Sequence, residues 1–137
     1  MKKIRQNSKK GFTLVELIVV LVILAVMAAM LVPALTGYID EARKKKDYNA
    51  ASEVLTAAQA LVAEYYGNPV DASGNAETAS ITGAAAYVDR NDTRIAQLTG
   101  ISGVTVDNVT CDTNYQINKI TVHFGDKEYT WNGTAWN

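Results

Sequence analysis

The sequence predicts an α+β protein in which one long amino-terminal helix packs on a carboxyl-terminal antiparallel sheet. Residues 12–35 are apolar at all but three of 24 positions. Apolar side chains then recur at steps of three and four as far as residue 65, and from residue 104 they alternate with polar ones. Because the chain has 137 residues, one domain with one sizeable core is expected.

The apolar run 12–35 is long enough to cross a membrane. Its 24 residues would span about 36 Å as a helix, against a hydrocarbon core of about 30 Å. A cleavable secretory signal has a shorter apolar region of roughly 7–15 residues that ends in a small-x-small site, and no clear site of that kind stands near Pro33. We therefore expect a single membrane-crossing helix.

Charge is distributed unevenly and predicts the orientation of that helix. Residues 1–11 carry five basic side chains and no acidic one, which leaves eight basic and fourteen acidic residues, a net charge of −6, on residues 12–137. Since basic flanks stay in the cytoplasm, residues 1–11 are expected inside and the carboxyl-terminal part outside.

The helical pattern continues beyond the apolar run and predicts one helix over residues 12–66, roughly 80 Å long. Pro33 is expected to remove one backbone hydrogen bond and kink it. At the other end, Gly67 is expected to adopt a left-handed C-cap and Pro69 to block continuation. The apolar stripe of its second half comprises Leu35, Tyr38, Ile39, Ala42, Ala51, Val54, Leu55, Ala58, Leu61, Val62 and Tyr65.

The remaining residues predict a loop, a short helical region and three strands. Residues 68–80 are small and polar, as in a surface loop, and residues 83–100 predict one short helix or two helical turns that end at Gly100. Strands are expected at 104–110, 115–124 and 128–132, followed by a hairpin at Asn132-Gly133. In the second strand one face, facing the helical stripe, should hold Ile120, Val122 and Phe124, and the other should hold Lys119, Thr121 and His123.

No pattern of catalytic or metal-binding residues is present in the sequence. The chain has one histidine and no His/Cys metal spacing, so we expect no enzyme activity, no cofactor and no metal site. Cys111 is the single cysteine, so an intrachain disulfide is excluded. We expect it to be a small buried side chain. A nucleophilic role would need a base, and His123 is a weak candidate for one. The basic run 43–46 favours a solvated helix face or an intersubunit contact over lipid or DNA, since residues 12–137 are acidic.

The stretch "KKGFTLVEL", residues 9–17, resembles the processing site of type IV pilins and related pseudopilins. A basic leader ends in Gly11, Phe12 follows, Glu16 is the fifth residue after the junction, and an apolar helix comes next. The resemblance implies a pilin fold, cleavage between Gly11 and Phe12 by a prepilin peptidase, and N-methylation of Phe12. It also implies that Pro33 marks a bend in the helix. Residues 1–11 would then be the leader, 12–35 the transmembrane and polymerisation half of the helix, and 36–137 the globular domain, with the helix at 36–66, the loop and short helix at 67–103 and the sheet at 104–137.

Glu16 needs a partner, because a charge within hydrocarbon costs roughly 2.5–3.5 kcal/mol even on lenient insertion scales. Cleavage after Gly11 would create a charged amine on Phe12, and in a bundle of such helices that amine on a neighbouring subunit is the best available cation. Two alternatives are a carboxylate that reaches the cytoplasmic headgroups and an ion pair within one chain. Small side chains at Ala25, Ala28 and Ala29 would let neighbouring helices approach closely.

These expectations describe a structural subunit of a type IV pilus, used in adhesion, motility or surface colonisation. Its partners would be copies of itself, a prepilin peptidase and methyltransferase, and an assembly platform with its ATPase, and it would sit in the membrane before assembly; no specific nucleic acid is expected. The first alternative is a pseudopilin of a type II secretion or DNA-uptake system. A single-pass anchored binding module and an anchored enzyme are further alternatives. Cys111 departs from the disulfide of many pilins of two-membrane bacteria and favours a single-membrane source.

Overall fold

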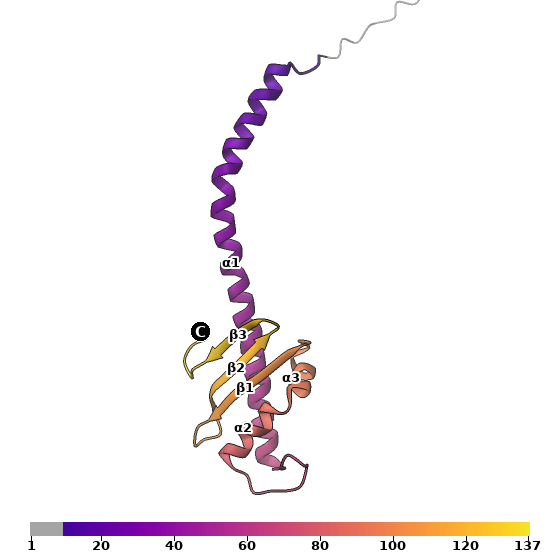
Figure 1. Cartoon of the computed structure of the whole chain (residues 1–137), viewed down its shortest axis with the longest axis vertical. Coiled ribbons are helices and arrows are strands. Elements are labelled where there is room, and N and C mark those ends of the chain that lie inside the picture. Colours follow the sequence, from indigo (N-terminus) through magenta and orange to yellow (C-terminus); the bar gives the residue numbers. More distant parts are fainter. Residues whose placement is uncertain (1–9) are drawn as a thin grey trace, which may run out of the picture. The chain divides into compact units, whose positions relative to one another are not determined.

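The computed structural model describes residues 10–137, in which three helices are followed by a three-stranded antiparallel sheet (Figure 1). The helices are α1 (Leu14–Gly67), α2 (Ile81–Asp89) and α3 (Asp92–Thr99), and the strands are β1 (Val104–Cys111), β2 (Ile117–Phe124) and β3 (Lys127–Trp131). The predicted α+β class is therefore confirmed. Residues 1–9 of the expected leader, which include four of its five basic side chains, lie outside the described residues.

Helix α1 extends through two compact units, one up to Arg43 and one from Lys44. Among the described residues of the first unit, every large apolar side chain is at least 42% exposed. The helix is long and apolar enough to cross a membrane. The helix is not interrupted at Pro33, and the hydroxyl of Thr36 donates to the Pro33 carbonyl at 2.9 Å. The bend at Pro33 stays a prediction.

The carboxyl end of α1 differs from the expectation for Gly67. This glycine is the last helical residue and has no positive φ, so the predicted left-handed C-cap is wrong. The amide of Asn68 still donates to the Glu64 carbonyl at 3.0 Å, which continues the helical pattern by one residue. Pro69 has no N–H to donate next, so proline ends the helix without help from glycine. The left-handed cap does occur at Gly100, after α3, where φ is 70°.

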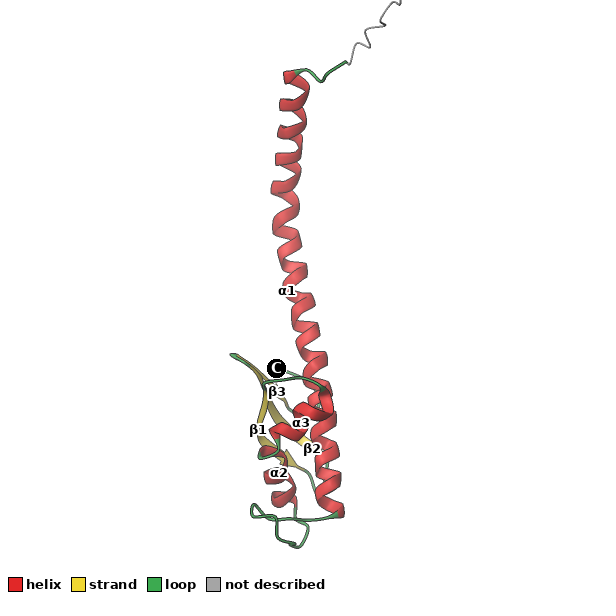
Figure 2. Cartoon of the chain, turned by 90° about the vertical axis from the view of Figure 1, so that its right-hand side faces the viewer, coloured by secondary structure: helices red, strands yellow, loops and turns green. Residues whose placement is uncertain are grey.

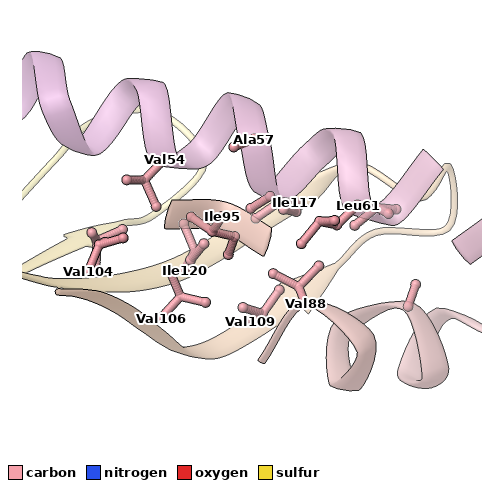
Figure 3. Packing of buried hydrophobic residues seen from close by; sticks show 14 of the residues in the cluster. Val54, Ala57, Leu61, Val88, Ile95, Val104, Val106, Val109, Ile117 and Ile120 are labelled. Atoms are coloured by element: carbon pink, nitrogen blue, oxygen red, sulfur yellow. The ribbon is translucent and has the colours of Figure 1, made fainter. Parts of the chain in front are cut away.

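In the second unit the sheet, α2 and α3 enclose one core together with the carboxyl part of α1 (Figures 2 and 3). Figure 3 shows Val54, Ala57 and Leu61 of α1 directed toward side chains of the strands. The buried part of the helical stripe begins at Ala51, whereas the earlier stripe residues Leu35, Tyr38, Ile39 and Ala42 are exposed. The prediction that the whole stripe packs on the sheet is wrong for these four, because periodicity shows that an apolar face exists and not what covers it.

The sheet has the order β1-β2-β3, with both neighbouring pairs antiparallel. Residue 104 lies opposite residue 124, and a two-residue turn at 125–126 joins β2 to β3, with Gly125 at a φ of 61°. Thr121 was expected on the solvent face but is only 3% exposed. Its hydroxyl lies 3.2 Å from that of Thr130 on β3, so the polar group is satisfied in the central strand.

Neither outer edge of the sheet is bare in the described part of the chain. At β1, the amides of Val106 and Val109 donate to the carboxylates of Asp92, at 2.9 Å, and Asp89, at 3.3 Å. At β3, the backbone groups of Thr130 pair with those of Asn137, at 3.0 and 3.1 Å. The second contact closes the hairpin predicted at Asn132-Gly133.

The turn between β1 and β2 is longer than the sequence predicted, because it takes in residues 115 and 116. Residues 115 and 116 were expected in the second strand, but Tyr115 has a φ of 61°, in the left-handed region that a bulky side chain disfavours at a cost of about 1–3 kcal/mol. The carboxylate of Asp112 accepts from the amides of Asn114 and Gln116, at 2.8 and 2.9 Å. From α1, the Gln59 side chain donates to the Tyr115 carbonyl at 2.7 Å and accepts from the Ile117 amide at 2.9 Å. These bonds hold the strained residue in place.

A polar contact joins α1 to the β2–β3 hairpin within the second unit. The Asp47 carboxylate accepts from Lys127 Nζ at 2.6 Å and from the Tyr129 hydroxyl at 2.7 Å. The bonds from Lys127 and Tyr129 lower the pKa of Asp47 below its ordinary value of 3.8. The bond to Asp47, with burial, raises the pKa of Tyr129 to about 12.

We expect Asp47→Ala to lower the free energy of unfolding at pH 7 by about 1–2 kcal/mol, because the half-buried Tyr129 hydroxyl loses its acceptor. Lys127 is more than half exposed, so solvent screening keeps the contribution of its ion pair with Asp47 to the free energy of unfolding small. Since the pKa of Asp47 is lowered on folding, its contribution is present above its unfolded pKa of about 3.9 and is lost as pH falls through the folded value.

Urea unfolding of the full chain in detergent micelles, at pH 7 and at acid pH, measures this difference. The gap between wild type and Asp47→Ala should narrow as the pH falls. Glu53→Ala, an exposed acidic position on the same helix, is the matched control and should change little. Equal losses from both substitutions would contradict the role of Asp47.

Candidate processing and assembly site

The peptide bond between Gly11 and Phe12 lies in a non-helical segment, two residues before the first residue of α1. Phe12 is 88% exposed, and a Cβ placed on Gly11 would meet nothing within 4 Å. Exposed, irregular backbone of this kind is what a peptidase can draw into an extended conformation. The predicted junction is therefore open to an enzyme in the unprocessed chain.

Thr13 and Glu16 form a reciprocal pair of hydrogen bonds at the beginning of α1. The Thr13 amide donates to Glu16 Oε2 at 2.9 Å, and the Glu16 amide donates to Thr13 Oγ1 at 3.2 Å. This is a capping box, which satisfies two amides that the first helical turn leaves without partners. The carboxylate also lies in the first turn, where the helix dipole favours negative charge.

The capping box was not predicted, although the letters "TLVE" at 13–16 carry its signal. It adds a partner for Glu16 that none of the three sequence-based hypotheses contained: a backbone amide of its own chain. One carboxylate can accept several hydrogen bonds, so the cap leaves Oε1 available to a cation. Capping within a chain and pairing between chains are therefore compatible roles for Glu16.

The predicted site residues fall into two groups. Gly11, Phe12 and Glu16 line one open depression of about 420 Å³, together with Lys10 and Thr13. Pro33 lies 17 residues beyond Glu16 along the same helix, about 25 Å at 1.5 Å per residue, and takes no part in this depression. Between them, the apolar side chains of α1 are exposed on every face. A surface of that size requires lipid, detergent or other protein to cover it.

The groups weighed for catalysis do not assemble within the described residues. Cys111 pairs with Ile117 at one end of the β1–β2 ladder, whereas His123 pairs with Thr105 near the other. Burial raises the pKa of the half-buried Cys111 thiol, and His123 Nε2 lies 3.1 Å from an Asp107 carboxylate oxygen. Among residues 10–137 no three His, Cys, Asp or Glu side chains gather as they would around a metal ion.

The family described as "Prokaryotic N-terminal methylation motif" matches residues 6–32, which include the exposed junction, the capping box and most of the apolar run. In this amino-terminal part the chain is similar to type IV pilin-like proteins. Its long helix and antiparallel sheet confirm the pilin fold that the resemblance implied. The motif and the exposed apolar helix agree with insertion in a membrane before assembly.

One curated protein that this chain is similar to is the type II secretion system core protein G of Klebsiella michiganensis. The two are 39% identical over 57 residues, which are 42% of this chain and 38% of that protein. The chain thus matches well under half the length of that relative. No solved structure matches the chain. Together these similarities support a relationship to pilins and pseudopilins.

We expect Thr13→Ala to fray the first turn of α1, because the Glu16 amide loses its acceptor, at a cost of about 1 kcal/mol to the helix end. Amide hydrogen exchange of residues 12–17, measured by NMR on the full chain in micelles, should accelerate about fivefold. Thr36→Ala, within the same helix, is the control and should leave these amides unchanged. Unaltered exchange in Thr13→Ala would show that the capping box does not hold this turn.

Proposed function

We propose that this protein is the structural subunit of a type IV pilus. A prepilin peptidase cuts between Gly11 and Phe12, and Phe12 is N-methylated. Before assembly, the helix over residues 12–35 spans the membrane once. It then polymerises with copies of itself, driven by the assembly platform and its ATPase, into a surface filament that serves adhesion, motility or colonisation. The observation that carries the proposal is an exposed Gly11–Phe12 bond just before an apolar helix that Thr13 and Glu16 cap and that no other part of the described chain covers.

Cleavage changes the physical state of the helix in two ways. It removes the five basic side chains of residues 1–11, which hold the amino end in the cytoplasm. It also creates an amine on Phe12, one residue from the amide that Glu16 already holds. In a bundle of helices that excludes water, the Phe12 amine of a neighbouring copy can reach Glu16 Oε1 and fix the axial step between subunits. Because the contact joins different surfaces of each copy, it propagates into a filament.

The similarity to type II secretion core protein G favours a second candidate, a pseudopilin of a type II secretion or DNA-uptake system. Both candidates share processing and assembly and differ in the filament. Long, abundant filaments on the cell surface would support the pilus, and short filaments confined to the envelope would support the pseudopilus. An intact leader on the purified protein would instead indicate a single-pass anchored module and contradict both.

The first prediction for this function concerns recognition of the junction. Gly11→Leu should leave the leader attached, because the new side chain occupies the position where the peptidase must bind. A side chain there meets nothing within 4 Å in the chain itself, so the substitution should not disturb folding. Mass spectrometry of the amino terminus measures the outcome: methylated Phe12 in the wild type, and the uncut precursor in the variant.

Gly37→Ala is the matched control, since Gly37 also has nothing within 4 Å but lies well inside α1. It should be processed normally. Normal processing of Gly11→Leu would contradict the assignment of the cleavage site.

The second prediction separates the charge of Glu16 from its capping role. Glutamine also serves in a capping box, so Glu16→Gln keeps the helix cap and removes only the negative charge. We expect the yield of sheared filaments to fall by more than tenfold, because the Phe12 amine of the neighbouring subunit would be left without its counter-charge in a dry bundle.

Thr13→Ala is the complementary variant, which removes the cap and retains the charge, and it should assemble at a reduced but measurable level. Both variants must first show a methylated Phe12 terminus. Filament yield equal to wild type in Glu16→Gln would exclude the intersubunit ion pair.

A further inference from the structure

A groove in the carboxyl-terminal unit is lined by none of the predicted processing and assembly residues. It lies between the last turns of α1 and the β1–β2 turn and has a volume of about 460 Å³. Its apolar floor includes Val62, and its walls include Gln59, Tyr66, Asn114, Tyr115 and Gln116. The volume is within the range of about 300–1,000 Å³ that small-molecule sites occupy.

The wall formed by the β1–β2 turn is rigid and strained. Tyr115 has a φ of 61°, and the Gln59 side chain holds the Tyr115 carbonyl and the Ile117 amide that follows it. This conformation brings the Tyr115 ring edge-on to that of Tyr66, with the centroids 4.9 Å apart and the planes at 66°. Strained backbone that the surrounding contacts over-determine is a feature of ligand-binding loops, because it fixes side chains before the ligand arrives.

The lining indicates the chemistry of the ligand. None of the described side chains that line the groove is Asp, Glu, Lys, Arg or His. An anionic ligand would find no cation there, and a cationic ligand would find no carboxylate. The polar groups are amides and hydroxyls, which both donate and accept hydrogen bonds.

Two amides are available for a ligand. The backbone amides of Asn114 and Gln116 bond to Asp112, but their side-chain amides form no hydrogen bond within the described chain. Tyr66 is 61% exposed, so one of the two aromatic rings is also accessible. A ligand that fits must combine an apolar face, for the tyrosine and Val62, with a rim of neutral hydroxyl groups, for the amides.

We propose that this groove binds an uncharged oligosaccharide. A pyranose ring has an apolar face of C–H groups that packs on an aromatic ring, and equatorial hydroxyls that match the side-chain amides of Asn114 and Gln116. The groove lies within the unit from Lys44 onward, so this activity goes beyond filament formation and does not require it.

The test is an NMR titration of the full chain in dodecylphosphocholine micelles, a detergent without a sugar head group. Cellotetraose and triacetylchitotriose are the neutral probes, and sialyllactose is the anionic comparison. We expect the side-chain amide signals of Asn114 and Gln116 to shift and saturate with a neutral probe at millimolar concentration. Tyr66→Ala and Asn114→Ala should each weaken that binding about tenfold.

The control variants lie outside the groove. Tyr38→Ala removes an exposed tyrosine, and Asn49→Ala removes an exposed amide, both on α1. They should bind as wild type. Absence of saturable shifts with both neutral probes, or equal affinity in Tyr66→Ala, would overturn the proposal. So would tighter binding of sialyllactose, or shifts of the same amides with protein concentration alone, which would identify a second copy of the chain as the occupant.

Discussion

The structure depends on one constraint: α1 carries two apolar surfaces, and the described chain covers only one of them. From Ala51 to Tyr65 one face of the helix is buried against the sheet, α2 and α3. Up to Leu35 its large apolar side chains face outward on every side. Water cannot serve as the cover for such a surface. The unit from Lys44 onward therefore covers its own apolar core, whereas the apolar surface of α1 up to Leu35 needs lipid or further protein to cover it.

Glu16 is the one acidic side chain within that uncovered surface, and the capping box changes how its presence is explained. The carboxylate is bonded to the Thr13 amide while residues 10 and 11 are still attached, so its position does not depend on the proposed cleavage. A preorganised acceptor loses less freedom when a counter-charge arrives than a mobile one would. The Glu16 side chain thus caps the amino end of the helix and holds its second carboxylate oxygen in a fixed position for a counter-charge.

Much of this architecture follows from local patterns, and the parts that do not follow depend on contacts distant in sequence. Periodicity predicted α1 and the strands because it reports which faces are apolar. It could not show that Tyr115 leaves the strand, because that conformation depends on Gln59, more than fifty residues earlier. Burial of Thr121 likewise depends on its neighbour across the sheet. The junction at Gly11 is implied by the resemblance to pilin processing sites and stays a prediction, whereas the cap at Thr13 was not predicted although "TLVE" carries its signal.

The hydrogen bonds at the two borders of the sheet have a consequence for crowding. Strands with unpaired borders recruit strands of other molecules and can grow into cross-β aggregates. Here the amides of Val106 and Val109 on one side are taken by acidic side chains, and on the other side Thr130 is paired by the end of the chain. Many copies can thus be concentrated side by side without their sheets merging. The uncovered apolar surface of α1, and not the borders of the sheet, is therefore the surface left for contact between copies.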